Sequence, residues 1–275
     1  MNDVLTQFVS SDQAILDSIR QLDSDNSSLA AANSSLSSQN SSLQSQLSSL
    51  QSQLSALQNI TVFDHLEYGE WLLAGGTAAN SGATGNTAVA TQTQPGVQSA
   101  SFSLSPNGSF ANAYWFKRLG ARPEKKSFKY ELSILMPSPT DAAASQAVEF
   151  EWQQVISHKV FNIGWQFDFA QNVFRVWNRT LHGTGKEPWI ATPLTSPRWT
   201  AGSWANVAVE GHRDDGGVFY DTVTINGVRT VLNISFPATL EPSQPDMLNV
   251  AFQLDGNGSS TSYRVNVDNI KFTAS

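Results

Sequence analysis

The sequence predicts a mainly β protein: a jelly-roll β-sandwich of two antiparallel sheets, preceded by a long N-terminal α-helical coiled coil. Apolar residues recur every seven positions up to residue 61. From Val62 onward, apolar and polar residues alternate in short runs separated by turn-forming residues. All 18 Gly and all 11 Pro of the 275 residues lie at or after Gly69. The predicted domains are therefore a stalk, 1–61, and a β-sandwich head, 62–275.

An unbroken heptad series marks the stalk. Its d positions are Phe8, Ile15, Leu22, Leu29, Leu36, Leu43, Leu50 and Leu57. Apolar a positions lie three residues before some of these, at Leu5, Ile19, Leu47 and Leu54. A lone amphipathic helix would have a wider apolar stripe that drifts away from a strict spacing of seven, so the series favours a coiled coil.

The a positions in the middle of the stalk are Asn26, Asn33 and Asn40. A buried Asn at a lowers stability, but it fixes register and parallel orientation because each amide pairs with its copy. Flanking Ser, Ala, Gln and Asp provide no charge pattern for a different partner. We therefore expect a parallel homodimer or homotrimer, held by Asn26, Asn33, Asn40, Leu43, Leu47, Leu50 and Leu54. The alternative is a disordered Ser/Gln linker, since Ser and Asn are poor helix formers.

The head has the pattern of short strands joined by turns, without a helical period after Val62. Alternation gives each strand an apolar face and a polar face, which is typical of a sandwich or barrel. The expected strands are 97–104, 113–119, 127–136, 146–156, 161–169, 172–178, 203–211, 217–226, 228–234, 247–254 and 262–273.

The polar faces of several of these strands are rich in acids and amides. If the strands are neighbours, they build one polar surface from Glu149, Glu151, Gln153, Gln166, Asp168, Arg175 and Trp177. Five tryptophans fall within forty residues, and alternation assigns Trp165 to the core. Trp177 and Trp189 are the better candidates for exposed rings, on which the apolar face of a sugar can stack.

Three stretches of the head share features with one known superfamily. The first is Trp204-Ala-Asn-Val207 with the later Asn226-Gly227 turn, the second runs from Val265 to Phe272, and the third is Val148-Glu149-Phe-Glu151-Trp-Gln153. In this order they resemble the concanavalin A-like lectin/glucanase superfamily, including laminin-G-like domains, over residues 66–275. The resemblance implies two curved antiparallel sheets with a concave face that often binds glycans.

The third stretch resembles the Glu-x-Asp-x-Glu strand of family 16 glucanases. On that resemblance Glu149 takes the nucleophile position, Glu151 the intervening acid and Gln153 the acid/base position. Retaining glycosidases need two carboxyl groups, and an amide cannot donate and recover the proton. We therefore expect a head that is not an enzyme. If it is one, Glu149 and Glu151 are the pair that remains.

Charge and composition limit the partners. The net charge of −7 disfavours nucleic acid, which needs clustered Lys and Arg. No apolar run is long enough for a membrane span, and Cys is absent. No cofactor is expected, although these sandwiches often hold calcium with loop carboxylates, so a structural calcium ion is kept as an expectation. The low-charge, Ser- and Asn-rich surface favours an extracellular or cell-surface location.

The sequence thus favours a non-catalytic, lectin-like head that binds a polysaccharide or surface glycan, displayed on an oligomerising stalk. Linked heads raise the weak affinity of single sugar sites. Two alternatives remain: a structural or adhesive fibre component whose head binds protein or only self-assembles, and a divergent glycoside hydrolase.

Overall fold

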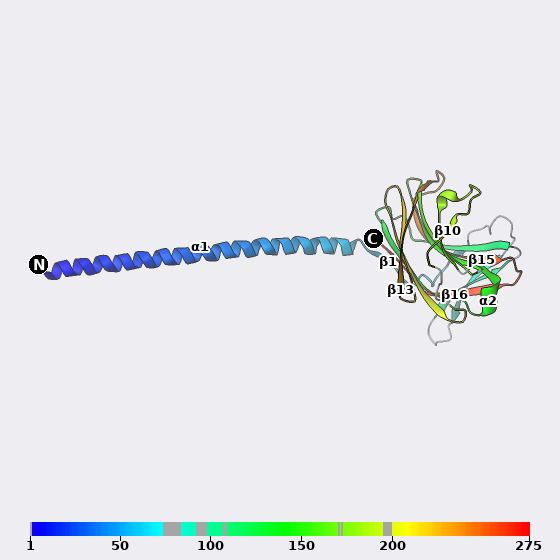
Figure 1. The fold of residues 1–275 in the computed structure, drawn as a ribbon, viewed down its shortest axis with the longest axis horizontal. Helices are drawn as coiled ribbons and strands as arrows, with labels where there is room; N and C mark the ends of the chain where they lie inside the picture. The colour runs from blue at the N-terminus through cyan, green and yellow to red at the C-terminus, as the bar shows by residue number, and fades with distance from the viewer. Residues whose placement is uncertain are drawn as a thin grey trace. The chain divides into compact units, whose positions relative to one another are not determined.

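The computed structural model describes residues 2–73, 84–91, 98–106, 109–169, 171, 173–194 and 200–275. The chain divides into two compact units, Met1–Asn59 and Ile60–Ser275. The first is a single long helix and the second is built of strands (Figure 1). The mainly β fold with a long N-terminal helix is confirmed. The division at residue 61 into a coiled-coil stalk and a head stays a prediction.

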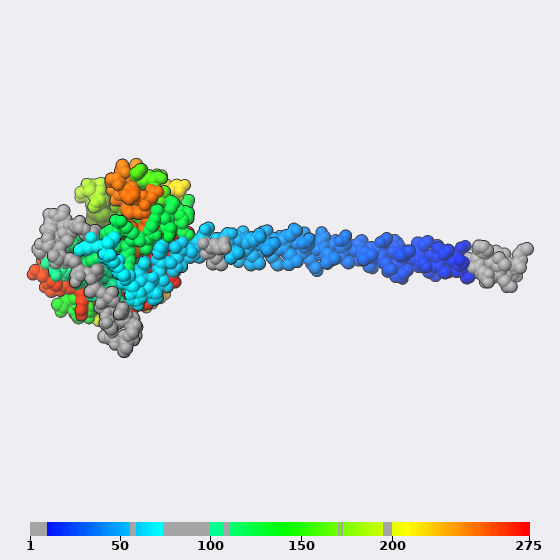
Figure 2. All heavy atoms as spheres, turned by 180° about the vertical axis from the view of Figure 1, so that it is seen from behind, coloured from blue at the N-terminus to red at the C-terminus, as the bar shows by residue number. Residues whose placement is uncertain are grey.

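Helix α1 spans Asn2–Gln58 in one piece, so this segment is not the disordered linker considered above. Its many serines are accommodated because their hydroxyl groups donate to carbonyl groups one turn earlier, as Ser41 does to Ser37 and Ser45 to Ser41. All side chains from residue 10 to residue 55 are exposed (Figure 2). The heptad leucines from Leu22 to Leu54 are among them, with Leu29 67% exposed. The apolar seam is thus uncovered in the single chain, and its self-association stays a prediction.

Sixteen strands in the described part of the head form two antiparallel sheets. In order across sheet A lie β13 (Val228–Pro237), β12 (Gly217–Ile225), β11 (Trp204–Arg213), β6 (Ser127–Leu135), β16 (Tyr263–Ala274), β4 (Gln98–Ser105) and β3 (Thr84–Thr91), with β1 (Thr61–Phe63) beside β16. In order across sheet B lie β10 (Trp189–Ala191), β9 (Val173–Trp177), β8 (Lys159–Asp168), β7 (Ser145–Ile156), β15 (Met247–Asn257), β5 (Ser109–Arg118) and β2 (Leu72–Leu73), with β14 (Thr239–Leu240) beside β8. The predicted sandwich of two antiparallel sheets is confirmed.

The expectation of no helix after Val62 is wrong in two short places. Helix α2 spans Pro139–Ala144, where Ser138 caps the first turn by accepting the Asp141 N–H at 3.2 Å. A 3-10 turn, η1, spans Arg179–Leu181. Elements of six and three residues are too short to produce a 3.6-residue period, which explains why the pattern missed them. The predicted strands also lack β1, β2, β10 and β14, whose two or three residues are too few to show an alternation, and β3, whose eight residues contain one large apolar side chain, Val89.

The core lies between the two sheets and is largely aromatic. Its largest fully buried side chains include Trp115, Trp152 and Trp165 from sheet B, and Tyr130 and Tyr220 from sheet A. Trp165 is 1% exposed, as alternation predicted. Because every second residue of a strand enters this core, the intervening residues of β7, β8 and β15 are directed to the outer face of sheet B.

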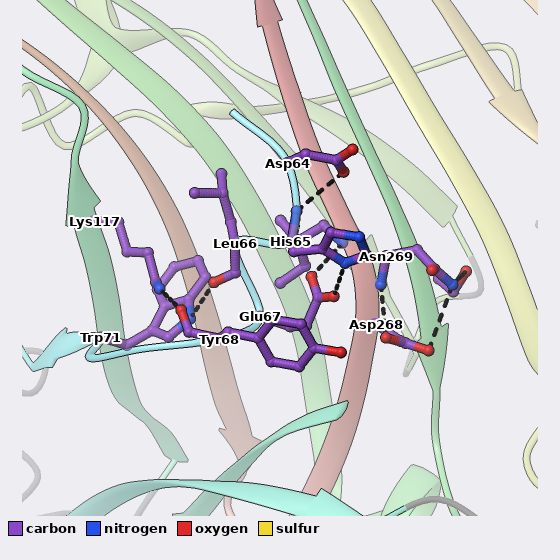
Figure 3. Close-up of polar contacts among 11 residues, drawn as sticks. Asp64, His65, Leu66, Glu67, Tyr68, Trp71, Lys117, Asp268 and Asn269 are labelled. Atoms are coloured by element: carbon purple, nitrogen blue, oxygen red, sulfur yellow. Dashed lines mark hydrogen bonds and ion pairs between the residues drawn. The ribbon is translucent and has the colours of Figure 1, made fainter. Parts of the chain in front are cut away.

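The segment after β1 is tied to sheet A through Glu67, which is 1% exposed (Figure 3). Its Oε2 accepts the Ile270 N–H at 2.8 Å, at a register shift in β16 where Asn269 has φ 51°. Its Oε1 lies 2.9 Å from His65 Nδ1, and this hydrogen bond raises the His65 pKa above 6.5. A buried carboxylate thus satisfies a backbone donor that the bulge leaves out of the ladder.

No helix in the described part of the chain is both long and apolar enough to cross a membrane.

Candidate functional site

The outer face of sheet B carries an open cleft of about 480 Å³. Its described lining is mostly polar with two indole rings: Asn112, Gln146, Glu149, Glu151, Gln166, Asp168, Gln171, Arg175, Trp177, His182, Glu187, Trp189, Gln253 and Asp255. Seven of the eight residues that the sequence pointed to as ligand-binding lie here. The eighth, Gln153, is not among the lining residues, and its Nε2 donates to Gln244 Oε1 at 2.8 Å.

The floor of the cleft is organised around Glu149. Gln166 on β8 and Gln253 on β15 are its direct cross-strand neighbours on either side. Gln166 Nε2 donates to Glu149 Oε1 at 2.6 Å, and Gln253 Nε2 donates to Oε2 at 2.8 Å. Glu149 is only 9% exposed, so these two amides replace the water that the carboxyl group loses on burial.

Asp255, which is 5% exposed, forms a carboxyl pair with Glu149. The two carboxyl groups influence each other's pKa, because ionising both would place two negative charges side by side in a buried place. Burial raises the pKa of Asp255 to about 6, against hydrogen bonds from Gln253 and Asn112 that lower it. Burial and the negative charge of Asp255 raise the pKa of Glu149 well above 4.5. The pair therefore retains a proton under conditions in which exposed carboxyl groups are ionised.

Glu151 lies beside this pair on β7 and is held at both oxygens. Tyr114 Oη donates to its Oε1, and Asn162 Nδ2 donates to its Oε2 at 3.1 Å. Burial and the neighbouring Glu151 raise the pKa of Tyr114 well above 10.0, so the phenol stays a donor. The Glu151 carboxylate is thus fixed in position at the cleft wall.

Gly164, directly opposite Glu151 on β8, leaves room for the aromatic side of the cleft. A Cβ at this position would lie 3.0 Å from Trp177 Cβ, 3.4 Å from Glu151 Oε2 and 3.5 Å from Trp189 Cη2. Because Gly164 has no side chain, the side chains of Trp177, Trp189 and Glu151 can pack close together against this part of β8.

Trp177 and Trp189 form the aromatic wall. They are cross-strand partners on β9 and β10, with ring centroids 4.9 Å apart and planes at 61°. The β8–β9 pairing ends at Trp165 and Val176. Beyond it, the Tyr220 hydroxyl bridges the two strands. Tyr220 Oη accepts the Gly164 N–H at 3.0 Å and donates to the Trp177 carbonyl at 2.8 Å. A core side chain of sheet A thus sets the position of Trp177.

Arg175 fastens the end of the cleft beside β10. Its Nη1 donates to the Trp189 carbonyl at 3.1 Å, its Nη2 donates to Gln171 Oε1, and its Nε lies 3.5 Å from Asp168 Oδ2. Asp168 is 2% exposed and also accepts the Gln171 N–H at 2.9 Å. The guanidinium group is therefore used mainly to hold the wall together.

The sequence did not single out Gln253, Asp255, Asn112, Tyr114 or Gly164 as residues of the site. Gln253 and Asp255 are on β15, far along the chain from β7, and no short motif links them. Their alternation with buried Phe252 and Leu254 was the one usable signal. Among the residues that the structure describes, no group of three or more His, Cys, Asp and Glu could hold a metal ion.

No protein-family model matches the sequence, and no curated protein matches it. Solved structures similar to this chain include arcelin-5, a lectin-like defense protein from Phaseolus vulgaris, at 9% identity and TM-score 0.45, covering 79% of this chain and 99% of that one. Peanut lectin is similar at 12% identity and TM-score 0.43, covering 78% and 97%. An endo-1,3-β-glucanase from Streptomyces sioyaensis is similar at 11% and 0.40, covering 78% and 96%.

Lectins and an endo-1,3-β-glucanase are thus among the solved structures that are similar to this chain. The likeness is remote, and it says nothing of what this chain binds.

Proposed function

We propose that the head is a non-catalytic, lectin-like glycan-binding module and that the cleft on sheet B is its binding site. The observation that carries the proposal is the meeting, in one open cleft, of two half-buried tryptophans with fixed amides and carboxylates. A sugar has apolar ring faces and many hydroxyl groups, so it is recognised by an aromatic ring and hydrogen-bonding groups together.

The internal contacts of the cleft support the same proposal. Glu149, Glu151 and Arg175 each make at least two contacts with neighbouring groups before any ligand arrives. Side chains held in this way lose little conformational freedom on binding, which improves affinity. We assign ligand binding to the cleft-lining residues of the predicted set, Glu149, Glu151, Gln166, Asp168, Arg175, Trp177 and Trp189, and add Gln253.

A glycan-array screen of the intact chain tests this proposal. Trp177→Ala should weaken binding to a recognised glycan by about tenfold, because it removes the stacking surface. Trp204→Ala is the matched control, since Trp204 is a half-buried tryptophan of β11 on sheet A. Binding that survives Trp177→Ala would move the site away from this cleft. Absence of binding to every glycan would favour the structural or adhesive fibre component instead.

The stalk belongs to the same proposal: α1 forms a parallel homodimer or homotrimer that displays several heads at a cell surface or outside the cell. Nine heptad leucines and isoleucines between residues 15 and 54 are at least 54% exposed, a large apolar stripe to leave in water: Ile15, Ile19, Leu22, Leu29, Leu36, Leu43, Leu47, Leu50 and Leu54.

Light scattering of the intact chain tests the stalk. Leu43→Asp with Leu50→Asp should convert an oligomer into monomers, because two charges would enter the seam. Ser45→Asp with Ser52→Asp is the control, since it adds the same charges to residues outside the a and d positions. A wild-type monomer, or an oligomer that survives the leucine changes, would contradict the stalk proposal.

Glycoside hydrolysis is the second candidate, and the Glu149–Asp255 pair is the observation that favours it. The pair keeps a proton and can supply the acid, and the neighbouring Glu151 carboxylate can supply the base. Release of reducing ends from a bound polysaccharide, lost in Asp255→Asn and in Glu151→Gln, would establish this activity and displace the non-catalytic proposal.

A further inference from the structure

The charge of the cleft restricts the kind of glycan that fits it. The described lining contains five carboxyl groups, those of Glu149, Glu151, Asp168, Glu187 and Asp255, against two basic groups, the imidazole of His182 and the guanidinium of Arg175. The guanidinium already lies 3.5 Å from Asp168. With both basic groups charged and one proton on the Glu149–Asp255 pair, the lining still carries an excess of negative charge. An anionic glycan would meet repulsion here, and a cationic one would meet attraction.

The hydrogen-bond donors of the floor point the same way. The Nε2 groups of Gln166 and Gln253 donate to Glu149, and the Nη groups of Arg175 donate to Trp189 and Gln171. Each of these groups already donates a hydrogen bond to an acceptor of the protein itself. Lone pairs of carboxylate and amide oxygens therefore dominate what the floor offers to a ligand, so the ligand must itself bring donors.

The wall of the cleft brings negative charge beside aromatic side chains. Around Gly164, the Cβ of Trp177, the Oε2 of Glu151 and the Cη2 at the ring edge of Trp189 lie within 3.0 to 3.5 Å of the position that a Cβ would take, so all three side chains are packed close together there. The indole of Trp is the best aromatic partner for a cation, and a carboxylate beside it supplies the counter-charge. The convergence of the two is the chemistry that recognises an ammonium group.

We propose that the cleft binds a cationic glycan, an oligosaccharide of amino sugars with free ammonium groups, and that one ammonium lies in the cleft beside Glu151, Trp177 and Trp189. This proposal rests on the proposed function, because it specifies the ligand class of the same cleft. We propose amino sugars rather than small quaternary ammonium compounds, because an open cleft of about 480 Å³ is large enough to hold more than a single headgroup.

Calorimetric titration of the intact chain tests the proposal with three oligosaccharides of equal length: fully deacetylated chito-oligosaccharide, its N-acetylated form, and cello-oligosaccharide. At slightly acid pH and low salt, the deacetylated form should bind about tenfold more tightly than either neutral one. Added salt should reduce that preference, because it screens the ammonium from the carboxylates.

Two variants locate the ammonium. Glu151→Gln should abolish the preference for the deacetylated form, and Gly164→Ala should weaken it, because the added Cβ would displace Trp177 and Glu151. Glu131→Gln, the same charge change on sheet A, should leave it intact. Thermal unfolding of each variant shows whether it folds; if Glu151→Gln does not, Glu187→Gln tests the charge with an exposed residue and should reduce the preference.

The outcomes separate this proposal from the one it rests on. Equal or tighter binding of a neutral oligosaccharide would overturn the amino-sugar proposal and leave a glycan-binding cleft. Binding of choline as tightly as the deacetylated oligosaccharide would overturn it as well, in favour of a small-cation site. Failure of all oligosaccharides to bind would overturn both proposals.

Discussion

The outer faces of the two sheets follow the same alternation of apolar and polar residues but differ in how they treat charge. On sheet A, ion pairs such as Lys129–Glu131, at 2.7 Å, stay substantially in water, with side chains 39% and 32% exposed. On sheet B, Glu149, Gln166, Asp168 and Asp255 are all at most 9% exposed. Burial makes each of these polar groups of sheet B depend on its neighbours, whereas the exposed Lys129–Glu131 pair of sheet A is close to independent of its surroundings.

Sheet A also carries an open groove, of about 390 Å³, lined by residues that include Glu131, Ser133, Asn206 and Lys271. Ser133 Oγ donates to Asn206 Oδ1 at 2.8 Å there. No aromatic side chain is among its described lining residues. The two outer faces of the sandwich are therefore not equivalent. The cleft on sheet B, with its buried polar side chains and two tryptophans, is the better candidate for ligand binding.

The largest expected effect on the free energy of unfolding comes from the Glu149–Asp255 carboxyl pair on sheet B. The folded pKa of Asp255 is raised from 3.8 to about 6, so the folded state binds its proton more tightly than the unfolded state does. The contribution of Asp255 to stability is therefore fully present below about pH 4, and roughly 3 kcal/mol of it is lost as the pH rises through about 6. Asp255→Asn removes this contribution, because an amide can donate to Glu149 and accept from Gln253 without titrating.

Urea unfolding of wild type and Asp255→Asn, measured across this pH range, checks the prediction. The variant should gain stability relative to wild type as the pH rises. Parallel curves for the two proteins would show that Asp255 is not buried as described.

A smaller effect is expected from the core tyrosine that supports the cleft. Tyr220→Phe removes the hydroxyl that satisfies both the Gly164 N–H and the Trp177 carbonyl, which should cost about 2 kcal/mol. Tyr130→Phe is the matched control, because the Tyr130 hydroxyl is buried without a hydrogen-bond partner. It should be neutral or slightly stabilising. Equal losses in the two variants, measured by urea unfolding, would contradict the bridging role.

The smallest effect is expected on sheet A. Glu131→Gln breaks the exposed pair with Lys129, which should change the free energy of unfolding by less than about 1 kcal/mol, and less still at high salt. A double-mutant cycle with Lys129→Met measures the pair directly. A coupling free energy well above that limit would show that this exposed ion pair contributes more to stability than its exposure implies.

Local patterns were enough to predict most of the strands and the division of residues between core and surface. Trp165 was assigned to the core, and Trp177 to the outer face, because adjacent residues of a strand point to opposite sides. The same rule placed Glu149, Glu151 and Arg175 on a common side. Sequence alone could not show that Gln153, on the same face of β7, turns to Gln244 and does not line the cleft.

The alternation and the heptads are local, so they are legible in the chain itself: a helix before residue 59, antiparallel strands after it, and the polar side of each strand. Which strands lie side by side is a matter of long-range pairing, and only the folded sheet decides it. That pairing brings β15 against β7, so that the buried Asp255 raises the pKa of Glu149 and Gln253 donates to Glu149. It also sets Tyr220 beneath Trp177, across the core. Burial then decides the chemistry, because a carboxyl group takes its pKa from the solvent and partners around it, and no stretch of sequence contains those.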